Sequence, residues 1–270
     1  ADAAMRRVTP FDARGYYYYY SAETRGCRAP AIFGGFNPLS LSPSGFWLPE
    51  PQYLFEEEDG TGTITATEAV GYNADISGTG LHLIHATAGN RPTYQTGGGL
   101  HWLQFDGVDD FLANATGVGA VADFTIVWAQ RETTRQNGAA FSYSTDDAGN
   151  INRLIAHTPF GDGNFYVDAY SDLTDGRLTG VWPHAVDDDV VCSFRRSGAS
   201  AVFRTNGVVR DTGSDGTAIT SDIIVYGSLN NPLFRFAGRL YGMIFVPSAV
   251  GDGVLANLET YFGARAGLVL

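Results

Sequence analysis

The sequence contains no lysine. Its 17 basic residues are all arginines, and 29 aspartates and glutamates outnumber them, which leaves a formal net charge of −12. A negative surface repels the phosphate backbone of nucleic acids and the headgroups of anionic membranes. No apolar run approaches the roughly 20 residues of a transmembrane helix. We therefore expect no nucleic-acid partner and no membrane insertion.

Cysteine and catalytic motifs are also scarce. Cys27 and Cys192 are the two cysteines of the chain, too few for a zinc site or a disulfide framework, and we expect free thiols. Residues 1–10 lack the apolar segment of a secretory signal, and the sequence leaves open whether Met5 is the native start. No G-x-S-x-G, H-E-x-x-H or phosphate-binding loop is present. No catalytic residue is therefore assigned.

Glycine is abundant, at 34 of 270 residues. Short runs of β-branched and aromatic residues alternate with Gly, Asp and Asn, which is typical of an antiparallel sandwich or barrel. One helix is predicted over Asp252–Arg265, where apolar residues recur at helical spacing, with Asp252 as N-cap and Gly267 just past the end. The predicted strands cover residues 100–105, 124–129, 165–170, 190–194, 201–204, 208–209, 223–227 and 240–246.

Residues 1–45 differ from the rest and are interpreted as an N-terminal arm. Five consecutive tyrosines cannot all face one core in a strand, because alternate side chains point to opposite faces. Tyrosine suits contacts that are apolar at one end and wet at the other. The arm is expected to drive assembly, with a second copy as a homo-oligomer or with a neighbouring protein, or else to pack on its own sandwich. The assembly residues are Arg14, Tyr16, Tyr17, Tyr18, Tyr19, Tyr20 and Arg25.

Three segments, in order, resemble a known family. The first holds Arg91–Gly98 and Leu100–Leu112, which includes Phe105-Asp106-Gly107-Val108-Asp109-Asp110; the others are Phe236–Phe245 and Leu258–Gly267. They resemble the core motifs of concanavalin A-like, laminin-G-type jelly rolls, which are common in phage structural proteins. The resemblance implies an all-β fold over residues 46–270: one antiparallel jelly-roll sandwich with a C-terminal helix.

The resemblance also implies a place and a function. Such proteins are head spikes, capsid decorations or tail fibres of phage or phage-like gene transfer agent particles, so we expect the chain at a virion or particle surface. We expect it to bind host cell-surface or capsular polysaccharide without turnover, and its arm to contact other particle proteins. Two alternatives stay open. One is a polysaccharide lyase or glycoside hydrolase, although the E-x-D-x-E motif of jelly-roll hydrolases is absent. The other is a purely structural capsid module.

Sugar binding needs aromatic faces and nearby polar groups. Residues near the expected loops and strand ends supply both, although each could instead pack in the core or at the rim of the sandwich. The candidate carbohydrate-binding residues are Tyr143, Tyr170, Trp182, His184, Tyr226, Asn230 and Asn231.

A turn rich in carboxylates is the leading candidate metal site. Asp106, Asp109 and Asp110 lie within five residues of one another. Ca²⁺ takes six to eight oxygen ligands, so a calcium ion is one interpretation of this turn. The other is ordinary turn chemistry, in which aspartates accept hydrogen bonds from backbone amides.

Overall fold

The computed structural model describes residues 7–8, 18–19, 35–144, 153–170, 177–214, 219–221, 223–228 and 234–270. Within residues 1–34, the backbones of β1 (Arg7–Val8) and β2 (Tyr18–Tyr19) pair antiparallel. The expected assembly residues Arg14, Tyr16, Tyr17, Tyr20 and Arg25, and the side chains of Tyr18 and Tyr19, lie outside the described residues. The role of the arm stays a prediction.

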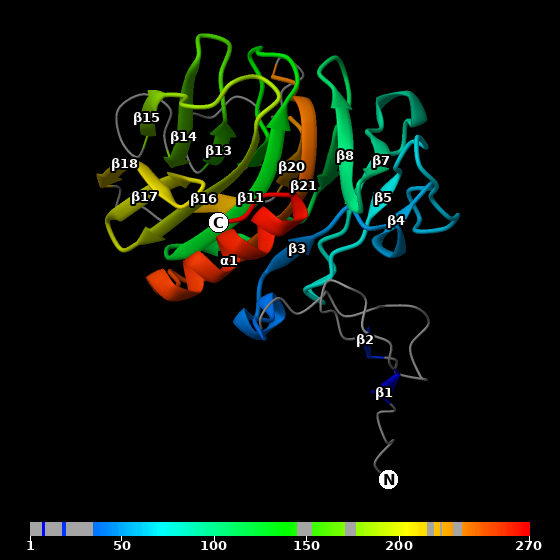
Figure 1. Cartoon of the computed structure of the whole chain (residues 1–270), viewed down its shortest axis with the longest axis horizontal. Helices are drawn as coiled ribbons and strands as arrows, with labels where there is room; N and C mark the ends of the chain where they lie inside the picture. The colour runs from blue at the N-terminus through cyan, green and yellow to red at the C-terminus, as the bar shows by residue number, and fades with distance from the viewer. Residues whose placement is uncertain are drawn as a thin grey trace.

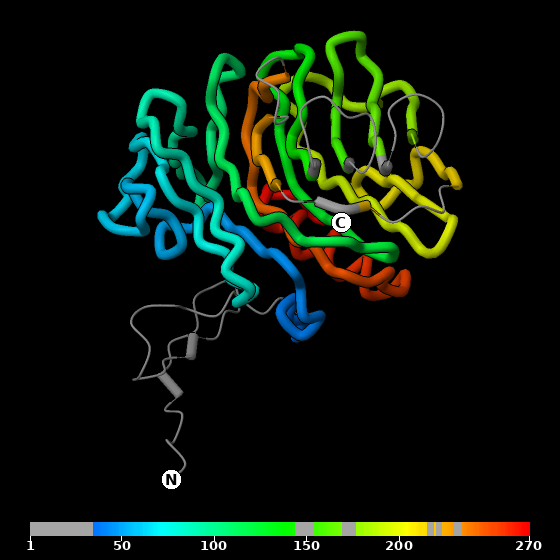
Figure 2. The backbone as a smooth tube through the Cα atoms, turned by 180° about the vertical axis from the view of Figure 1, so that it is seen from behind, coloured from blue at the N-terminus to red at the C-terminus, as the bar shows by residue number. Residues whose placement is uncertain are grey.

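Two large sheets make up the body, seen from opposite sides in Figures 1 and 2. Within the described residues the first has eight strands, in the order β18-β17-β16-β11-β21-β8-β7, with β3 paired to β21. These strands are β3 (Gly45–Trp47), β7 (Thr93–Gly97), β8 (Leu100–Asp106), β11 (Phe124–Glu132), β16 (Asp189–Ser197), β17 (Ser200–Thr205), β18 (Val208–Ser214) and β21 (Ala237–Val246).

The second sheet has nine strands in the described part of the chain, in the order β15-β14-β13-β12-β20-β9-β6-β5-β4. They are β4 (Leu54–Phe55), β5 (Tyr72–Asn73), β6 (Leu83–Ile84), β9 (Leu112–Asn114), β12 (Phe141–Ser144), β13 (Arg153–His157), β14 (Asn164–Tyr170), β15 (Arg177–Val181) and β20 (Ile223–Tyr226). Two further short strands, β10 (Gly119–Val121) and β19 (Ile219–Ser221), pair with each other, and 3-10 turns cover Pro38–Leu41, Pro51–Tyr53 and Ala88–Asn90.

All strand pairs among the described residues are antiparallel. The predicted all-β antiparallel jelly-roll sandwich with one C-terminal helix is confirmed, and each predicted strand overlaps an observed one. No helix in the described residues is long and apolar enough to cross a membrane.

The main core fills the space between the sheets, and β11 shows why the chain forms these layers. Phe124, Ile126 and Trp128 point into this core, while Val127 and Ala129 point to the other face of the same sheet. That outer face is covered by α1 (Asp252–Arg265), so β11 is apolar on both sides. A strand buried on both faces has an almost continuous hydrophobic sequence rather than an alternating one.

The helix occupies the predicted residues, and its buried face includes Leu255, Leu258, Tyr261 and Phe262. Its N-cap is Gly251, however, which corrects the prediction that Asp252 caps the helix. The Asp252 carboxylate turns instead toward Arg195, at 2.6 Å. At the other end, Gly267 takes a φ of +77°, the left-handed conformation that closes helices.

The segment before the sandwich packs on it. Phe36, Leu39 and Leu41 contact the core beneath α1. β3 then adds to the eight-stranded sheet by pairing with β21. Packed structure therefore begins about ten residues before the expected domain boundary at residue 46.

Candidate functional site

The hairpin formed by β13 and β14 of the nine-stranded sheet, together with the neighbouring strand β15, carries polar and aromatic side chains on its outer face. In β14, Phe165 and Val167 point into the core between the sheets. Tyr166 and Asp168 therefore point outward, because successive side chains of a strand alternate between its faces. The register places Asp168 opposite Arg177 of β15 and Tyr166 opposite His157 of β13. Side chains of three neighbouring strands thus meet on one surface.

Asp168 and Arg177 form a two-pronged ion pair on this surface. Nε of Arg177 lies 2.5 Å from Oδ1 of Asp168, and Nη2 lies 2.9 Å from Oδ2. The Asp168 side chain is 0% exposed and that of Arg177 is 29% exposed. The guanidinium carbon also lies 5.0 Å from the centroid of the Tyr166 ring, within range of a cation–π contact. The ion pair and the aromatic ring are therefore one unit.

An aromatic cluster continues from Tyr166. The Phe160 ring packs edge-on against Tyr166, at 5.7 Å between centroids. His157 and Phe234 complete the cluster, with centroids 5.1 Å and 6.0 Å from Phe160. Phe160, Tyr166 and Phe234 are only partly buried, so the cluster is accessible at the surface. We call these four aromatic residues, together with Asp168 and Arg177, the hairpin face.

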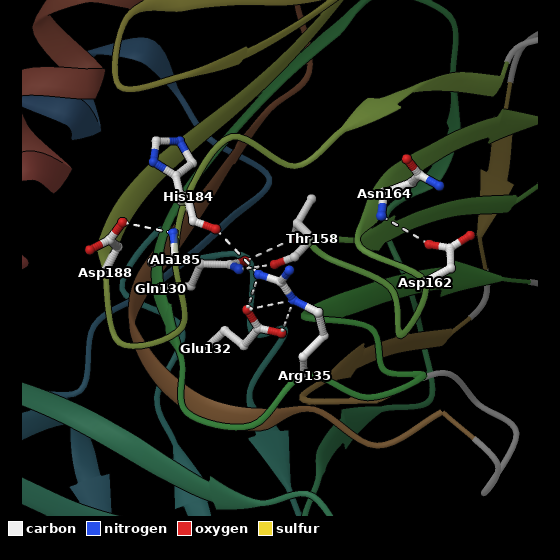
Figure 3. Close-up of polar contacts among 9 residues, drawn as sticks. All are labelled: Gln130, Glu132, Arg135, Thr158, Asp162, Asn164, His184, Ala185 and Asp188. Atoms are coloured by element: carbon white, nitrogen blue, oxygen red, sulfur yellow. Dashed lines mark hydrogen bonds and ion pairs between the residues drawn. The ribbon is translucent and has the colours of Figure 1, made fainter.

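The start of the loop between β13 and β14 is hydrogen-bonded to Gln130 (Figure 3), a fully buried residue of β11. Oε1 of Gln130 accepts hydrogen bonds from Nε1 of Trp128, at 2.7 Å, and from Oγ1 of Thr158, at 2.9 Å. Nε2 of Gln130 donates to the Thr158 carbonyl. One amide therefore ties the start of the loop to the eight-stranded sheet.

A second polar network, centred on Arg135, lies beside the hydrogen bonds of Gln130. In Figure 3 the Arg135 guanidinium lies between Glu132 and the backbone of His184. Its Nη2 is 3.1 Å from Oε2 of Glu132 and 3.2 Å from the carbonyl oxygen of His184. Oδ2 of Asp188 accepts from the amide of Ala185, at 2.9 Å. The loop at residues 182–189 is thus fastened to the end of β11.

At the tip of the hairpin, Asp162 organises the loop. It accepts hydrogen bonds from the amide of Asn164, at 2.9 Å, and from the Tyr166 hydroxyl, at 2.7 Å. The hydroxyl contact raises the pKa of Tyr166 and lowers the pKa of Asp162. Tyr166 is therefore restrained at its hydroxyl by Asp162 and over its ring by Arg177.

Three of the predicted sugar contacts are wrong. Tyr143, Trp182 and Tyr226 are 0%, 5% and 1% exposed, and all three pack in the core between the sheets. None presents a ring face to a ligand. The sequence placed them near strand ends but did not show which side of each strand faces the core.

His184 has a supporting position. Its ring packs edge-on against Trp182, at 5.2 Å, and its Nε2 lies 2.9 Å from Oγ1 of Thr205. Burial lowers its pKa. Tyr170 is the last residue of β14, and its backbone pairs with Arg153, but its side chain lies outside the described residues, as do Asn230 and Asn231.

The sequence analysis missed Phe160, Tyr166, Asp168, Arg177 and Phe234. One signal was available, since Asp168 is the one charged residue in the strand β14. The pairing of Asp168 with Arg177 had no signal in the sequence, because it depends on the register between β14 and β15.

The three aspartates of the acidic turn do come together. One carboxylate oxygen from each of Asp106, Asp109 and Asp110 lies within 4.8 Å of the others. Turn hydrogen bonds already use them. Oδ1 of Asp106 accepts from the amide of Val108, at 2.8 Å, and Oδ2 of Asp110 accepts from the amide of Asp106, at 2.9 Å. Burial raises the pKa of Asp110 to about 7, and the two neighbouring aspartates add to this. Calcium at this turn stays a prediction.

No family model matches the sequence, and no curated protein matches it. Solved structures do resemble its fold. Domain 4 of the arabinanase AbnA from Geobacillus stearothermophilus, solved with arabinotriose, is 14% identical with a TM-score of 0.55, over 68% of this chain and 91% of that chain. A GH54 α-L-arabinofuranosidase is 13% identical with a TM-score of 0.62, over 83% of this chain and 63% of that one.

The binding domain of botulinum neurotoxin serotype D is similar as well, at 8% identity and a TM-score of 0.55, over 83% of this chain and 52% of that chain. At such identities the likeness shows the fold. Strand order, antiparallel pairing and these likenesses together define the chain as an antiparallel jelly-roll sandwich.

Proposed function

We propose that the sandwich binds a glycan on the hairpin face and does not cleave it. The observation that carries this proposal is the accessible aromatic cluster beside the Asp168–Arg177 pair. The C–H face of a sugar ring packs on aromatic rings, while the partly exposed guanidinium of Arg177, held by the buried Asp168 carboxylate, donates hydrogen bonds to its hydroxyls. The network around Gln130 and Arg135 holds these side chains in place before a ligand arrives, which lowers the entropy lost on binding.

Binding without turnover agrees with the charges on this face. Glycosidases of the common types need two carboxyl groups on either side of the scissile bond. Among the described residues of β9, β12, β13, β14, β15 and β20, Asp168 is the one carboxylate, and it is paired with Arg177. Asp162, at the tip of the hairpin, is a second carboxylate beside this face, and it accepts a hydrogen bond from the Tyr166 hydroxyl at 2.7 Å. Both carboxylates are thus engaged by neighbouring side chains of the chain itself, which supports binding rather than hydrolysis.

The similar structures support a sugar ligand. One was solved with arabinotriose and another is an arabinofuranosidase, and both have folds like this chain. The motif resemblance adds a setting: a spike, decoration or tail fibre on a phage or phage-like particle, where the chain would bind capsular or cell-surface polysaccharide. Display in many copies would turn weak single-site affinity into firm attachment. The N-terminal arm would supply contacts to other particle proteins or to further copies of the chain.

The test compares three forms of the full chain on a panel of purified capsular and cell-surface polysaccharides and on capsulated and capsule-less cells. Tyr166→Ala removes the central ring of the hairpin face. Tyr72→Ala is the matched control, because Tyr72 lies on β5 at the other end of the same sheet. We expect capsule-dependent retention of the unchanged chain, retention about tenfold weaker for Tyr166→Ala, and little change for the control.

Each contrary outcome identifies a different function. New reducing ends or unsaturated uronates during incubation would show that the chain is a hydrolase or a lyase. Equal, negligible retention on all glycans and cells would remove the glycan proposal. Oligomerisation through the arm would then favour a purely structural module.

A further inference from the structure

The outer face of the eight-stranded sheet is only partly covered. α1 lies over β11, β16 and β21, whereas β8 lies to one side of the helix (Figure 1). Beyond the helix, side chains from four adjacent strands share one row. Gln104 of β8 is opposite Arg239 of β21, which is opposite Arg131 of β11, which is opposite Asp189 of β16. Trp102 of β8 and Tyr241 of β21 border this row.

One side of the row is closed by its own contacts. Nε of Arg131 donates to Oδ1 of Asp189 at 2.9 Å, and the Tyr241 hydroxyl donates to the same oxygen at 2.6 Å. Burial, and after it the contact with Asp189, raise the pKa of Tyr241 to about 12. Because Arg131 neutralises Asp189, this side of the row presents little net charge to a ligand.

The other side of the row is open. The guanidinium carbon of Arg239 lies 4.5 Å from the centroid of the Trp102 ring. Both side chains are partly exposed. No carboxylate of the described residues pairs with Arg239. Nε1 of Trp102 and Nε of Arg239 are buried and have no acceptor among the described residues. The Arg239 side chain also hydrogen-bonds to that of Tyr241, a neutral group. In a chain with a net charge of −12, Arg239 is therefore a cation beside an aromatic ring with no carboxylate of the described residues to neutralise it.

The backbone next to Trp102 leaves room for the ring. Gly97 of β7 lies beside it, and a Cβ at this position would contact the indole at 3.4 Å. Gln104 is held by two carbonyls, those of Phe105 and Gly238, each at 3.1 Å from its Nε2. Its Oε1 is not used in these contacts. This part of the sheet surface therefore combines the flat indole ring of Trp102, the charged hydrogen-bond donor Arg239 and the neutral amide of Gln104.

We propose that Trp102 and Arg239 form a second glycan subsite, specific for a sugar that carries a carboxylate, such as a uronic acid. The guanidinium can donate two parallel hydrogen bonds to a carboxylate, and the indole packs against the sugar ring. The acidic surface repels an anionic polysaccharide elsewhere, so this local cation decides where it binds. This inference rests on the proposed glycan-binding function but uses the opposite sheet.

The experiment uses the full chain and an α-1,4-linked oligogalacturonide of six residues, with its methyl ester as the neutral counterpart. Arg239→Gln removes the charge, and Arg239→Lys keeps the charge without the two-pronged geometry. Arg195→Gln is the matched control, because Arg195 lies on the outer face of the same sheet and is paired with Asp252. Tyr166→Ala tests the hairpin face separately. Thermal melting confirms that each variant is folded.

The expected result has four parts. The acid binds more tightly than its ester, and added salt weakens its binding. Arg239→Gln lowers affinity for the acid by about tenfold or more, and Arg239→Lys has a smaller effect. Arg195→Gln and Tyr166→Ala leave this affinity unchanged. Arg239→Gln leaves retention on neutral polysaccharides unchanged.

Three results would overturn the inference while leaving the proposed function intact. The first is unchanged affinity for the acid in Arg239→Gln. The second is loss of that affinity in Tyr166→Ala alone, which would place the acid on the hairpin face. The third is failure of the unchanged chain to bind the acid while neutral polysaccharides still bind. Failure to bind any glycan would remove both proposals together.

Discussion

Asp168 and Arg177 meet across β14 and β15 with two nitrogen–oxygen contacts, the carboxylate fully buried and the guanidinium partly exposed. This asymmetry predicts unequal effects of removing each partner. Arg177→Gln leaves a charged carboxylate without this partner in the interior, which we expect to cost about 3 kcal/mol. Asp168→Asn leaves a guanidinium that water can reach, at a cost of about 1 kcal/mol. Urea unfolding of both single variants and the double variant measures the difference. Equal costs would contradict the assigned burial.

Gln130 predicts a link between core stability and ligand binding. Gln130→Ala leaves the indole of Trp128 and both polar groups of Thr158 without their partner, so we expect a loss of about 3 kcal/mol in unfolding free energy. Because Thr158 begins the hairpin loop, glycan retention should also fall at temperatures where the variant is folded. Gln95→Ala is the control, since Gln95 is only half-buried and its Nε2 donates to Oγ1 of Thr93, at 3.2 Å. A comparable loss in the control would argue against the network.

Asp110 predicts a pH dependence of stability. Its pKa is about 7 in the folded chain, against about 3.9 in the unfolded chain. Between these values the folded state holds a proton that the unfolded state has released, so stability is present in acid and declines as the pH rises through 7. The decline reaches at most about 4 kcal/mol. Asp110→Asn lacks this dependence and should be more stable than the unchanged chain at pH 8, with the advantage gone near pH 4.

Thermal melting between pH 4 and pH 8 checks this difference. Asp59→Asn serves as the control, because Asp59 is exposed and its hydrogen bonds to Thr61 lower its pKa. The contribution of Asp59 to the stability of the folded chain therefore depends on pH in the opposite direction and is lost as the pH falls. A rise in stability of the unchanged chain from pH 5 to pH 8, relative to Asp110→Asn, would contradict the burial of Asp110.

Cys192 predicts resistance to thiol reagents. It is fully buried between the sheets, and burial raises the pKa of its thiol well above the ordinary value. The thiolate is the reactive form. In a Cys27→Ser background, we expect Cys192 to react with a disulfide reagent at pH 8 only as fast as the sandwich opens. Denaturant should accelerate the reaction in parallel with unfolding. Rapid reaction under native conditions would show that this part of the core is accessible.

Long elements were predictable from sequence, and short ones were not. The strands β8, β11, β16 and β21, of seven to ten residues, carry enough apolar residues to be recognised. The two-residue strands β4, β5 and β6 have no periodicity of their own and exist because each pairs with a neighbour. The helix residues were predictable from their spacing. The cap was not, because Asp252 has a competing partner in Arg195.

The all-β class, the C-terminal helix and the aromatic residues that fill the core could be read from the amino-acid sequence, because these follow from local alternation and turn residues. Which face of each strand is buried depends instead on how the two sheets pack against each other. Alternation separates the two faces of β14 but does not say which one meets the other sheet, so Tyr143 and Tyr226 are core residues while Tyr166 is accessible. The Asp168–Arg177 and Trp102–Arg239 pairs likewise exist only through strand register, which depends on contacts between segments apart in the chain.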